Sequence, residues 1–180
     1  VTADQPLQPL IDAAPAGSVL LVPAGTWRGP VTIVKPLTVD GAHAATLTNE
    51  GHGTVITVRA EGVRLRNLRV TGSGASHDAM DSAIVIERDD VRVEHCTLDD
   101  VLFGVWGNDV LDARDVTLAN ARDNLVAHNR IRGGRYGLQL VFAPRNVLED
   151  NFLDGNLTGV AVLYSNNVEL RRNVVQHSRR

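Results

Sequence analysis

The sequence predicts an all-β protein, a parallel β-helix built from stacked coils, and two observations lead to this fold class. Asn129, Asn151 and Asn173 lie 22 residues apart, and Gly137 and Gly159 keep the same interval. Around these markers, branched apolar residues occupy every second position, as in strands with one buried face. Such a short period is typical of a solenoid, in which each unit buries its apolar face only against its neighbours.

The chemistry of the repeat selects one kind of solenoid. The chain has neither the leucine-rich consensus nor the 3.6-residue spacing of helical repeats. The stretch GVAVLYSNNVELRRN (159–173) reads as a strand, a bend and a second strand, which makes most of one coil. Asparagine suits the bend, since it tolerates the left-handed backbone conformation and its amide can bond to a stacked asparagine. We therefore expect a structural ladder of Cys96, Asn129, Asn151 and Asn173.

The N-terminal segment predicts a short helix that caps the first coil. Leu7, Leu10, Ile11 and Ala14 are spaced at helical intervals, and a Pro-Ala-Gly stretch follows them. At the other end the sequence VVQHSRR stops in the middle of a repeat, and no comparable cap follows from its pattern. We therefore expect residues 1–180 to form a single β-helix domain that is truncated at its C-terminal end.

Composition narrows the classes of function. The formal net charge is −3 at pH 7, so no global basic field attracts nucleic acid. No apolar run is long enough to cross a bilayer, and the first residues, VTADQPLQPL, lack the features of a signal peptide. Cys96 is the single cysteine, which excludes an intrachain disulfide and a multi-cysteine zinc site.

Three stretches together resemble the NosD family, the periplasmic maturation proteins of nitrous oxide reductase. They are IDAAPAGSVLLVPAGTWRGPVTIVKPLTVDGA (11–42), GSGASHDAMDSAIVIE (72–87) and TGVAVLYSNNVELRRNVVQHS (158–178). The resemblance implies a right-handed, single-stranded parallel β-helix in the periplasm. It also implies a non-catalytic scaffold that helps ABC transporter subunits and a copper chaperone or the reductase to supply copper. Between Gly107 and Arg122 the sequence departs from a regular coil.

A copper-related role requires metal ligands, and two sets of residues are candidates. His77 and Met80 lie three residues apart on a predicted loop, and imidazole with thioether suits Cu(I). The alternative is a solvated His77 and a Met80 that packs on the rod as filler.

The second set of candidate ligands comes from the repeat register. His95, His128 and Asp150 each precede a ladder residue, and Arg172 follows them in the next copy. If their coils are neighbours, the side chains form one column that could hold Zn²⁺ or Cu²⁺. The alternative is that they are ordinary polar residues at a solvent-facing bend.

Trp106 is the candidate for contact with a partner. The repeat alignment gives it the outward position that Gln139 and Ala161 occupy in later coils. An outward tryptophan can anchor a protein partner or stack on a sugar ring.

The rival function is that of a polysaccharide-binding or polysaccharide-cleaving protein, a lyase or hydrolase, because one fold hosts many activities. Cleavage needs clustered carboxylates, for a cation or for acid and base catalysis. Asp78 and Asp81 are the best acid pair, without a fixed basic partner. The outward columns expected from the alignment do not supply such a cluster: one is Val85, Trp106, Gln139 and Ala161, and the other is Arg66, Glu94, Ala127, Glu149 and Arg171. A purely structural rod is a third possibility.

Overall fold

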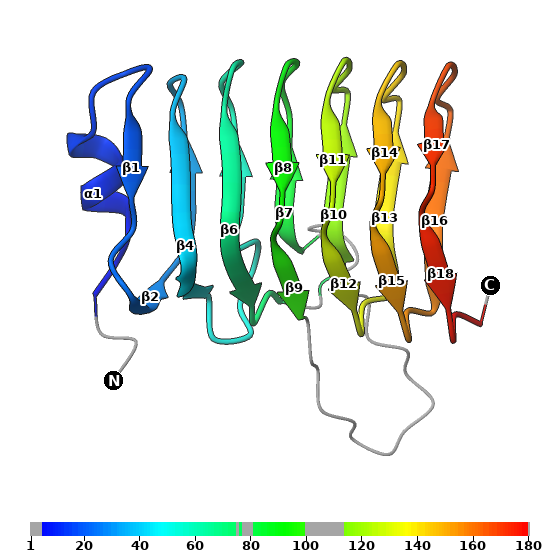
Figure 1. The fold of residues 1–180 in the computed structure, drawn as a ribbon, viewed down its shortest axis with the longest axis horizontal. Helices are drawn as coiled ribbons and strands as arrows, with labels where there is room; N and C mark the ends of the chain where they lie inside the picture. Colours follow the sequence, from blue (N-terminus) through cyan, green and yellow to red (C-terminus); the bar gives the residue numbers. More distant parts are fainter. Residues whose placement is uncertain (1–4, 75, 77–80, 100–113, 180) are drawn as a thin grey trace.

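Parallel strands in successive coils form two sheets along one rod (Figure 1). The computed structural model describes residues 5–74, 76, 81–99 and 114–179. Within these residues the paired strands of both sheets run parallel. Strands of neighbouring coils stand side by side along the long axis in Figure 1. The predicted all-β class with parallel, stacked coils is therefore confirmed.

The larger sheet bends around two sides of the rod. Its central strand, β6, pairs with β8 through its first half and with β9 through its second half. In later coils this long strand is divided into two short strands. In spatial order the sheet contains β17 (Glu169–Arg171), β14 (Val147–Glu149), β11 (Leu125–Ala127), β8 (Arg92–Glu94), β6 (Arg64–Thr71), β9 (Thr97–Asp99), β12 (Arg130–Arg132), β15 (Phe152–Asp154) and β18 (Val174–Gln176), and β4 (Thr38–Thr48) joins β6 to β1 (Val19–Leu21) and β2 (Gly25–Arg28).

The smaller sheet forms the remaining side. A complete coil contains one strand of this sheet and two of the larger sheet, as in β13, β14 and β15. In spatial order the smaller sheet contains β16 (Thr158–Leu163), β13 (Tyr136–Val141), β10 (Arg114–Ala119), β7 (Ser82–Ile86), β5 (Ile56–Val58) and β3 (Val31–Ile33).

The pairing of β10 settles the register where the repeat is irregular. Strand β10 pairs with both β7 and β13, and it places Thr117 opposite Val85 and Gln139. The expectation that Trp106 stands between Val85 and Gln139 in an exposed column is therefore wrong, since Thr117 takes this place and Thr117 and Gln139 are 0% and 6% exposed. The reason is that the coil between Cys96 and Asn129 is 33 residues long instead of 22, so sequence spacing alone misplaces the strand.

The interior consists of apolar columns that continue from coil to coil. Ile86, Leu118 and Leu140 face one another across paired strands, and each is 0% exposed. Full burial of one such side chain contributes about 1.5–3 kcal/mol to the free energy of unfolding. A side chain that repeats at the same coil position therefore lies on its counterpart in the next coil.

A short helix, α1 (Gln8–Ala13), covers the first coil (Figure 1). Leu7 and Ile11 are each 1% exposed and belong to the core. The side chain of Gln8 bonds to the edge strand β3, because its Oε1 accepts from the Thr32 N–H at 2.7 Å and its Nε2 donates to the Thr32 carbonyl at 3.1 Å. These bonds pair backbone groups that a sheet edge would otherwise leave exposed. Among the described residues, no helix is long and apolar enough to span a membrane.

Candidate metal-binding site

Stacked asparagines fix the bend next to the site. The Oδ1 of Asn129 accepts the N–H of Cys96 at 2.9 Å, and the Oδ1 of Asn151 accepts the N–H of Asn129 at 3.1 Å. Asn173 repeats the bond to the N–H of Asn151 at 3.0 Å. The side chain of each ladder asparagine therefore satisfies a backbone donor of the preceding coil.

The ladder asparagines Asn129, Asn151 and Asn173 do not themselves adopt the left-handed conformation that we expected of them. The left-handed backbone lies one residue earlier, at His95, His128, Asp150 and Arg172, with φ between 49° and 57°. The asparagine follows the bend and turns its amide inward, where Asn129 and Asn151 are 2% and 1% exposed. Asparagine is therefore suited to this position by the hydrogen bonds of its amide. The left-handed backbone belongs to the outward residue that precedes it.

The outward residues of this bend form a column, which we call the junction column: His43, Asn67, His95, His128, Asp150 and Arg172, all with positive φ. The bends lie between β8 and β9, β11 and β12, and β14 and β15, which stand in a row in Figure 1. Main-chain bonds hold neighbouring bends together, since the His128 N–H donates to the Glu149 carbonyl at 3.0 Å. Column members therefore project outward one coil apart.

The two central histidines of the column are stacked on each other. The ring centroids of His95 and His128 are 5.0 Å apart, and the ring planes differ by 5°. Both side chains are exposed. The irregular segment between them in the sequence therefore does not separate them in space, and the His95–His128 stack presents two imidazoles on one surface.

Asp150, the next residue of the column, is engaged by its other neighbour. Its carboxylate accepts two hydrogen bonds from the Arg172 guanidinium, both at 2.8 Å, whereas the nearest approach of His128 Nδ1 is 3.9 Å. The hydrogen bond from Arg172 is the largest cause that lowers the pKa of Asp150. The carboxylate is therefore engaged in the ion pair with Arg172. The imidazoles of His95 and His128 remain as the candidate metal ligands of this part of the column.

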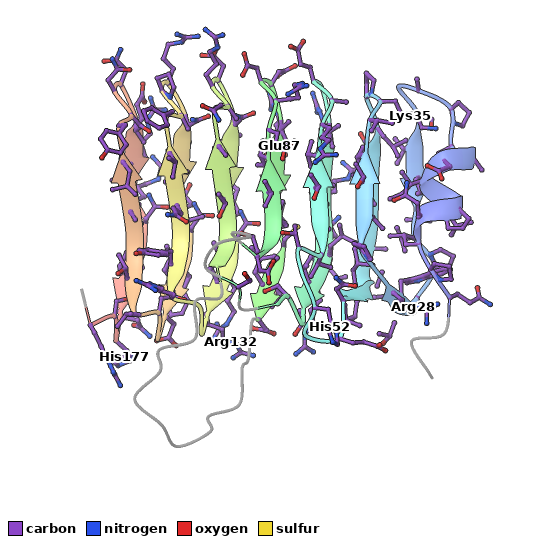
Figure 2. All side chains as sticks on the ribbon, turned by 180° about the vertical axis from the view of Figure 1, so that it is seen from behind. Arg28, Lys35, His52, Glu87, Arg132 and His177 are labelled. Atoms are coloured by element: carbon purple, nitrogen blue, oxygen red, sulfur yellow. The ribbon has the colours of Figure 1, made fainter. Side chains whose placement is uncertain are left out.

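Among the described residues, no cluster of three or more histidine, cysteine, aspartate or glutamate side chains could hold a metal ion. Apart from the column histidines His43, His95 and His128, the described residues contain His52 and His177, which lie at the edge of the rod where β4 and β18 end (Figure 2). His177 Nδ1 is 2.7 Å from the Asp154 carboxylate. His77, Met80 and Trp106 lie outside the described residues. The His95–His128 stack is therefore the candidate site that the structure places.

Cys96 lies beside the stack but is not available as a ligand. Its side chain is buried, and burial raises the pKa of the thiol to about 12. Because the thiolate is the form that binds metals and attacks electrophiles, a neutral buried thiol acts as a small apolar side chain. Its backbone N–H is its contribution to the ladder.

The state of Cys96 gives a direct prediction. We expect an aromatic disulfide reagent at pH 8 to modify the folded protein about 100-fold more slowly than the urea-unfolded protein, because both burial and the raised pKa suppress attack. The absorbance of the released thiol measures both rates. The unfolded sample is the control and will release one equivalent, since the chain has one cysteine. Comparable rates would show that the thiol is accessible.

Arginines of adjacent coils pair with carboxylates of the described strands and bends. Asp123 pairs with Arg145, and the hydrogen bond from that guanidinium is the largest cause that lowers the pKa of Asp123. Asp99 is 1% exposed and pairs with Arg69 and Arg132, the second of which is labelled in Figure 2. A general acid of a glycosidase needs a raised pKa, the opposite of the lowered pKa of Asp123.

Of the acid pair that we singled out, Asp78 lies outside the described residues. Asp81 is 7% exposed and accepts the N–H of Ser76 at 2.9 Å. A carboxylate held in this way fixes the backbone before β7.

The spacing of the sequence contains two further pairs that we did not predict, one exposed and one buried. Phe142 and Tyr164 stack with ring centroids 4.9 Å apart, and they are 55% and 79% exposed. Their separation of 22 residues is the signal that could have found them. Asn124 and Asn146 form a second ladder at the same interval, with a bond of 2.9 Å from the Asn124 N–H to the Asn146 Oδ1. His43 was also missed, because its coil carries extra residues.

The fold and the junction column define a class: a β-helix-like repeat protein that presents exposed imidazoles along one corner. A protein assigned as a glycosyl hydrolase from Parabacteroides merdae has the same fold, with a TM-score of 0.64, 13% identity, and coverage of 87% of this chain and 82% of that one. An alginate lyase from a Paenibacillus species gives a TM-score of 0.63, 15% identity, and coverage of 93% and 72%. At such identities these likenesses show the fold alone.

The chain belongs to the NosD family. The family model, described as periplasmic copper-binding protein (NosD), matches residues 48–180. This match confirms the resemblance seen in the sequence. No curated protein sequence matches the chain.

Proposed function

We propose that this chain is a non-catalytic accessory scaffold of the periplasm that handles copper as cargo during the maturation of nitrous oxide reductase. Its partners in this proposal are ABC transporter subunits and a copper chaperone or the reductase, and Trp106 is a candidate contact with them. Membership of a family described as periplasmic and copper-binding supports the role. We also propose that the coils wind right-handed, the usual hand of connections between parallel strands.

The observation that carries the proposal is the His95–His128 stack. Imidazole is a good copper ligand, and a metal ion shared by two imidazoles lies about 2 Å from each nitrogen. The exposed rings are 5.0 Å apart, so turning them about their side-chain bonds would let both reach one ion. Because Asp150 is engaged by Arg172, two nitrogen ligands remain, which favours Cu(I), an ion that accepts two ligands. A site with two ligands on the surface releases its ion readily, as cargo requires.

A Cu(I) competition titration tests the assignment. We expect His95→Asn or His128→Asn to weaken Cu(I) binding at least about tenfold, because each removes one of two ligands. Asparagine keeps the left-handed backbone that both positions require, so the bend is preserved. Bicinchoninate reports Cu(I) by its absorbance, and the parent for all variants carries His77→Asn and Met80→Leu.

The matched control is His52→Asn, which changes an exposed histidine elsewhere on the rod and will leave the affinity unchanged. Acidification will release the ion from the parent, since only neutral imidazole binds copper. Equal affinity of the parent and both stack variants would contradict the assignment.

The second candidate function is binding or cleavage of an acidic polysaccharide, and the fold likeness to an alginate lyase favours it. Against cleavage stands the pairing of the described carboxylates Asp99, Asp123 and Asp150 with arginines. Incubation with alginate and polygalacturonate, followed by absorbance at the wavelength of unsaturated sugars and a reducing-end assay, separates the candidates. Product release above that of heat-denatured protein would favour the enzyme.

A further inference from the structure

The junction column continues from the His95–His128 stack towards the first coils. Strand β4 pairs with β6 on both sides of an irregularity, Asp40 with Arg66 and Ala45 with Leu68. Residues 41–44 therefore face the single residue Asn67, and the extra residues bulge outward. His43 lies in this bulge, exposed and with φ 58°. The longer bend thus places a third imidazole on the corner that carries His95.

A buried carboxylate holds the bulge in shape. Asp40 is 9% exposed, and it accepts hydrogen bonds from the Ala42 N–H at 2.9 Å, the Asn67 Nδ2 at 2.9 Å and the Arg66 Nε at 2.8 Å. Burial opposes the ionisation of Asp40, but these bonds outweigh burial and lower its pKa. The carboxylate is thus charged at neutral pH and ties the bulge to the next coil.

A glycine allows the bulge to lie close to that coil. A Cβ on Gly41 would be 2.6 Å from the carbonyl oxygen of Asn67 and 2.8 Å from Leu68 Cδ2. Such contacts are too short for any side chain. Gly41 and Asp40 together fix the path of the main chain on which His43 stands.

The bulge and the next two coils line an open hollow of about 210 Å³. Its lining residues are His43, Asn67, Leu68, Arg69, His95 and Thr97. Arg69 brings a positive charge, but its Nη2 lies 3.1 Å from the Asp99 carboxylate. The hollow is therefore a recess between two imidazoles, one of which belongs to the His95–His128 stack on its other side.

Resting on the proposed function, we infer that His95 is shared by two Cu(I) positions, one with His43 across the hollow and one with His128 in the stack. A copper ion held by His43 and His95 can exchange His43 for His128 while it stays bound to His95. The ion thus moves along the rod from the His43–His95 position to the His95–His128 position by ligand exchange, without a change of oxidation state. Low coordination numbers suit this movement, because few bonds break at each step.

The experiment uses the same Cu(I) competition in the parent with His77→Asn and Met80→Leu. His43→Asn, His95→Asn, His128→Asn and the double variant with His43→Asn and His128→Asn are compared. Asparagine suits the positive φ at all three positions and already occupies the column at Asn67. We expect His128→Asn to retain a measurable site, and the double variant to bind Cu(I) at least about tenfold more weakly than His128→Asn. His95→Asn alone will match the double variant, because it belongs to both positions.

Two results would overturn the inference and separate it from the proposed function. If His128→Asn and the double variant bind Cu(I) equally, His43 takes no part, and the His95–His128 site of the proposed function stands. If the parent and all variants bind equally, both the inference and the proposed copper site fail. Urea unfolding midpoints equal to that of the parent will show that the bends of every variant are intact.

Discussion

Replacing Asn151 with leucine will lower the free energy of unfolding by about 3–5 kcal/mol. The side chain is 1% exposed, and its Oδ1 accepts the N–H of Asn129 at 3.1 Å and the Nδ2 of Asn129 at 3.0 Å. Its Nδ2 donates to the Val126 carbonyl at 2.8 Å. Leucine has a similar volume but leaves several buried polar groups without partners, at about 1–3 kcal/mol each. Urea unfolding followed by circular dichroism measures the loss.

The matched control for Asn151→Leu is Asn166→Leu. Asn166 is exposed, and its backbone carbonyl accepts the Arg145 N–H. The same substitution there will change stability by less than about 0.5 kcal/mol, because surface side chains away from special features contribute little. Similar losses for the two variants would mean that the buried ladder does not stabilise the coils beyond a surface amide.

Gly137→Ala will destabilise the protein by about 2–3 kcal/mol through overpacking. The backbone of Gly137 is outside the left-handed region, so the requirement for glycine is steric. A Cβ there would be 2.8 Å from the Gly159 carbonyl oxygen, 2.8 Å from Leu153 Cδ2 and 2.9 Å from Asn156 Nδ2. The backbone oxygen of the next coil cannot move without disturbing the pairing of β13 with β16. The urea midpoint will fall accordingly.

Gly155 provides the control for this prediction. It has φ +66°, and a Cβ there would meet nothing within 4 Å. Gly155→Asn keeps the left-handed conformation and will change stability by less than about 0.5 kcal/mol. If Gly137→Ala is equally harmless, neighbouring coils must separate more easily than their strand pairing indicates.

Much of the regular part of the molecule could be predicted because identical spacing means identical position in a coil. The 22-residue interval predicts that Asn129, Asn151 and Asn173 stack on one another. Side-chain hydrogen bonds join Asn129 to Asn151 and Asn151 to Asn173. The same interval would also have found Phe142 and Tyr164. Asparagine was placed correctly but for a partly wrong reason, since the left-handed residue precedes it.

The irregular coils were beyond prediction. The long coil before Asn129 has no internal marker, so the alignment put Trp106 where Thr117 lies. The bulge at 41–44 shifts the spacing of its coil, so His43 has no counterpart at a regular interval. Insertions of this kind cost a solenoid little stability when they leave the stacked strands intact. The spacing of residues along the sequence then no longer indicates their position in the coil.

The sequence by itself determined the class of fold, the ladder of asparagines and the family, because each depends on local alternation and on a period that is repeated without interruption. Only the tertiary structure decided that His95 and His128 stack, that Asp150 serves Arg172, and that His43 shares a hollow with His95. The physical reason is that backbone hydrogen bonds between paired strands determine which residues of two adjacent coils lie side by side. Those bonds keep the register through insertions of any length, which distance along the chain does not.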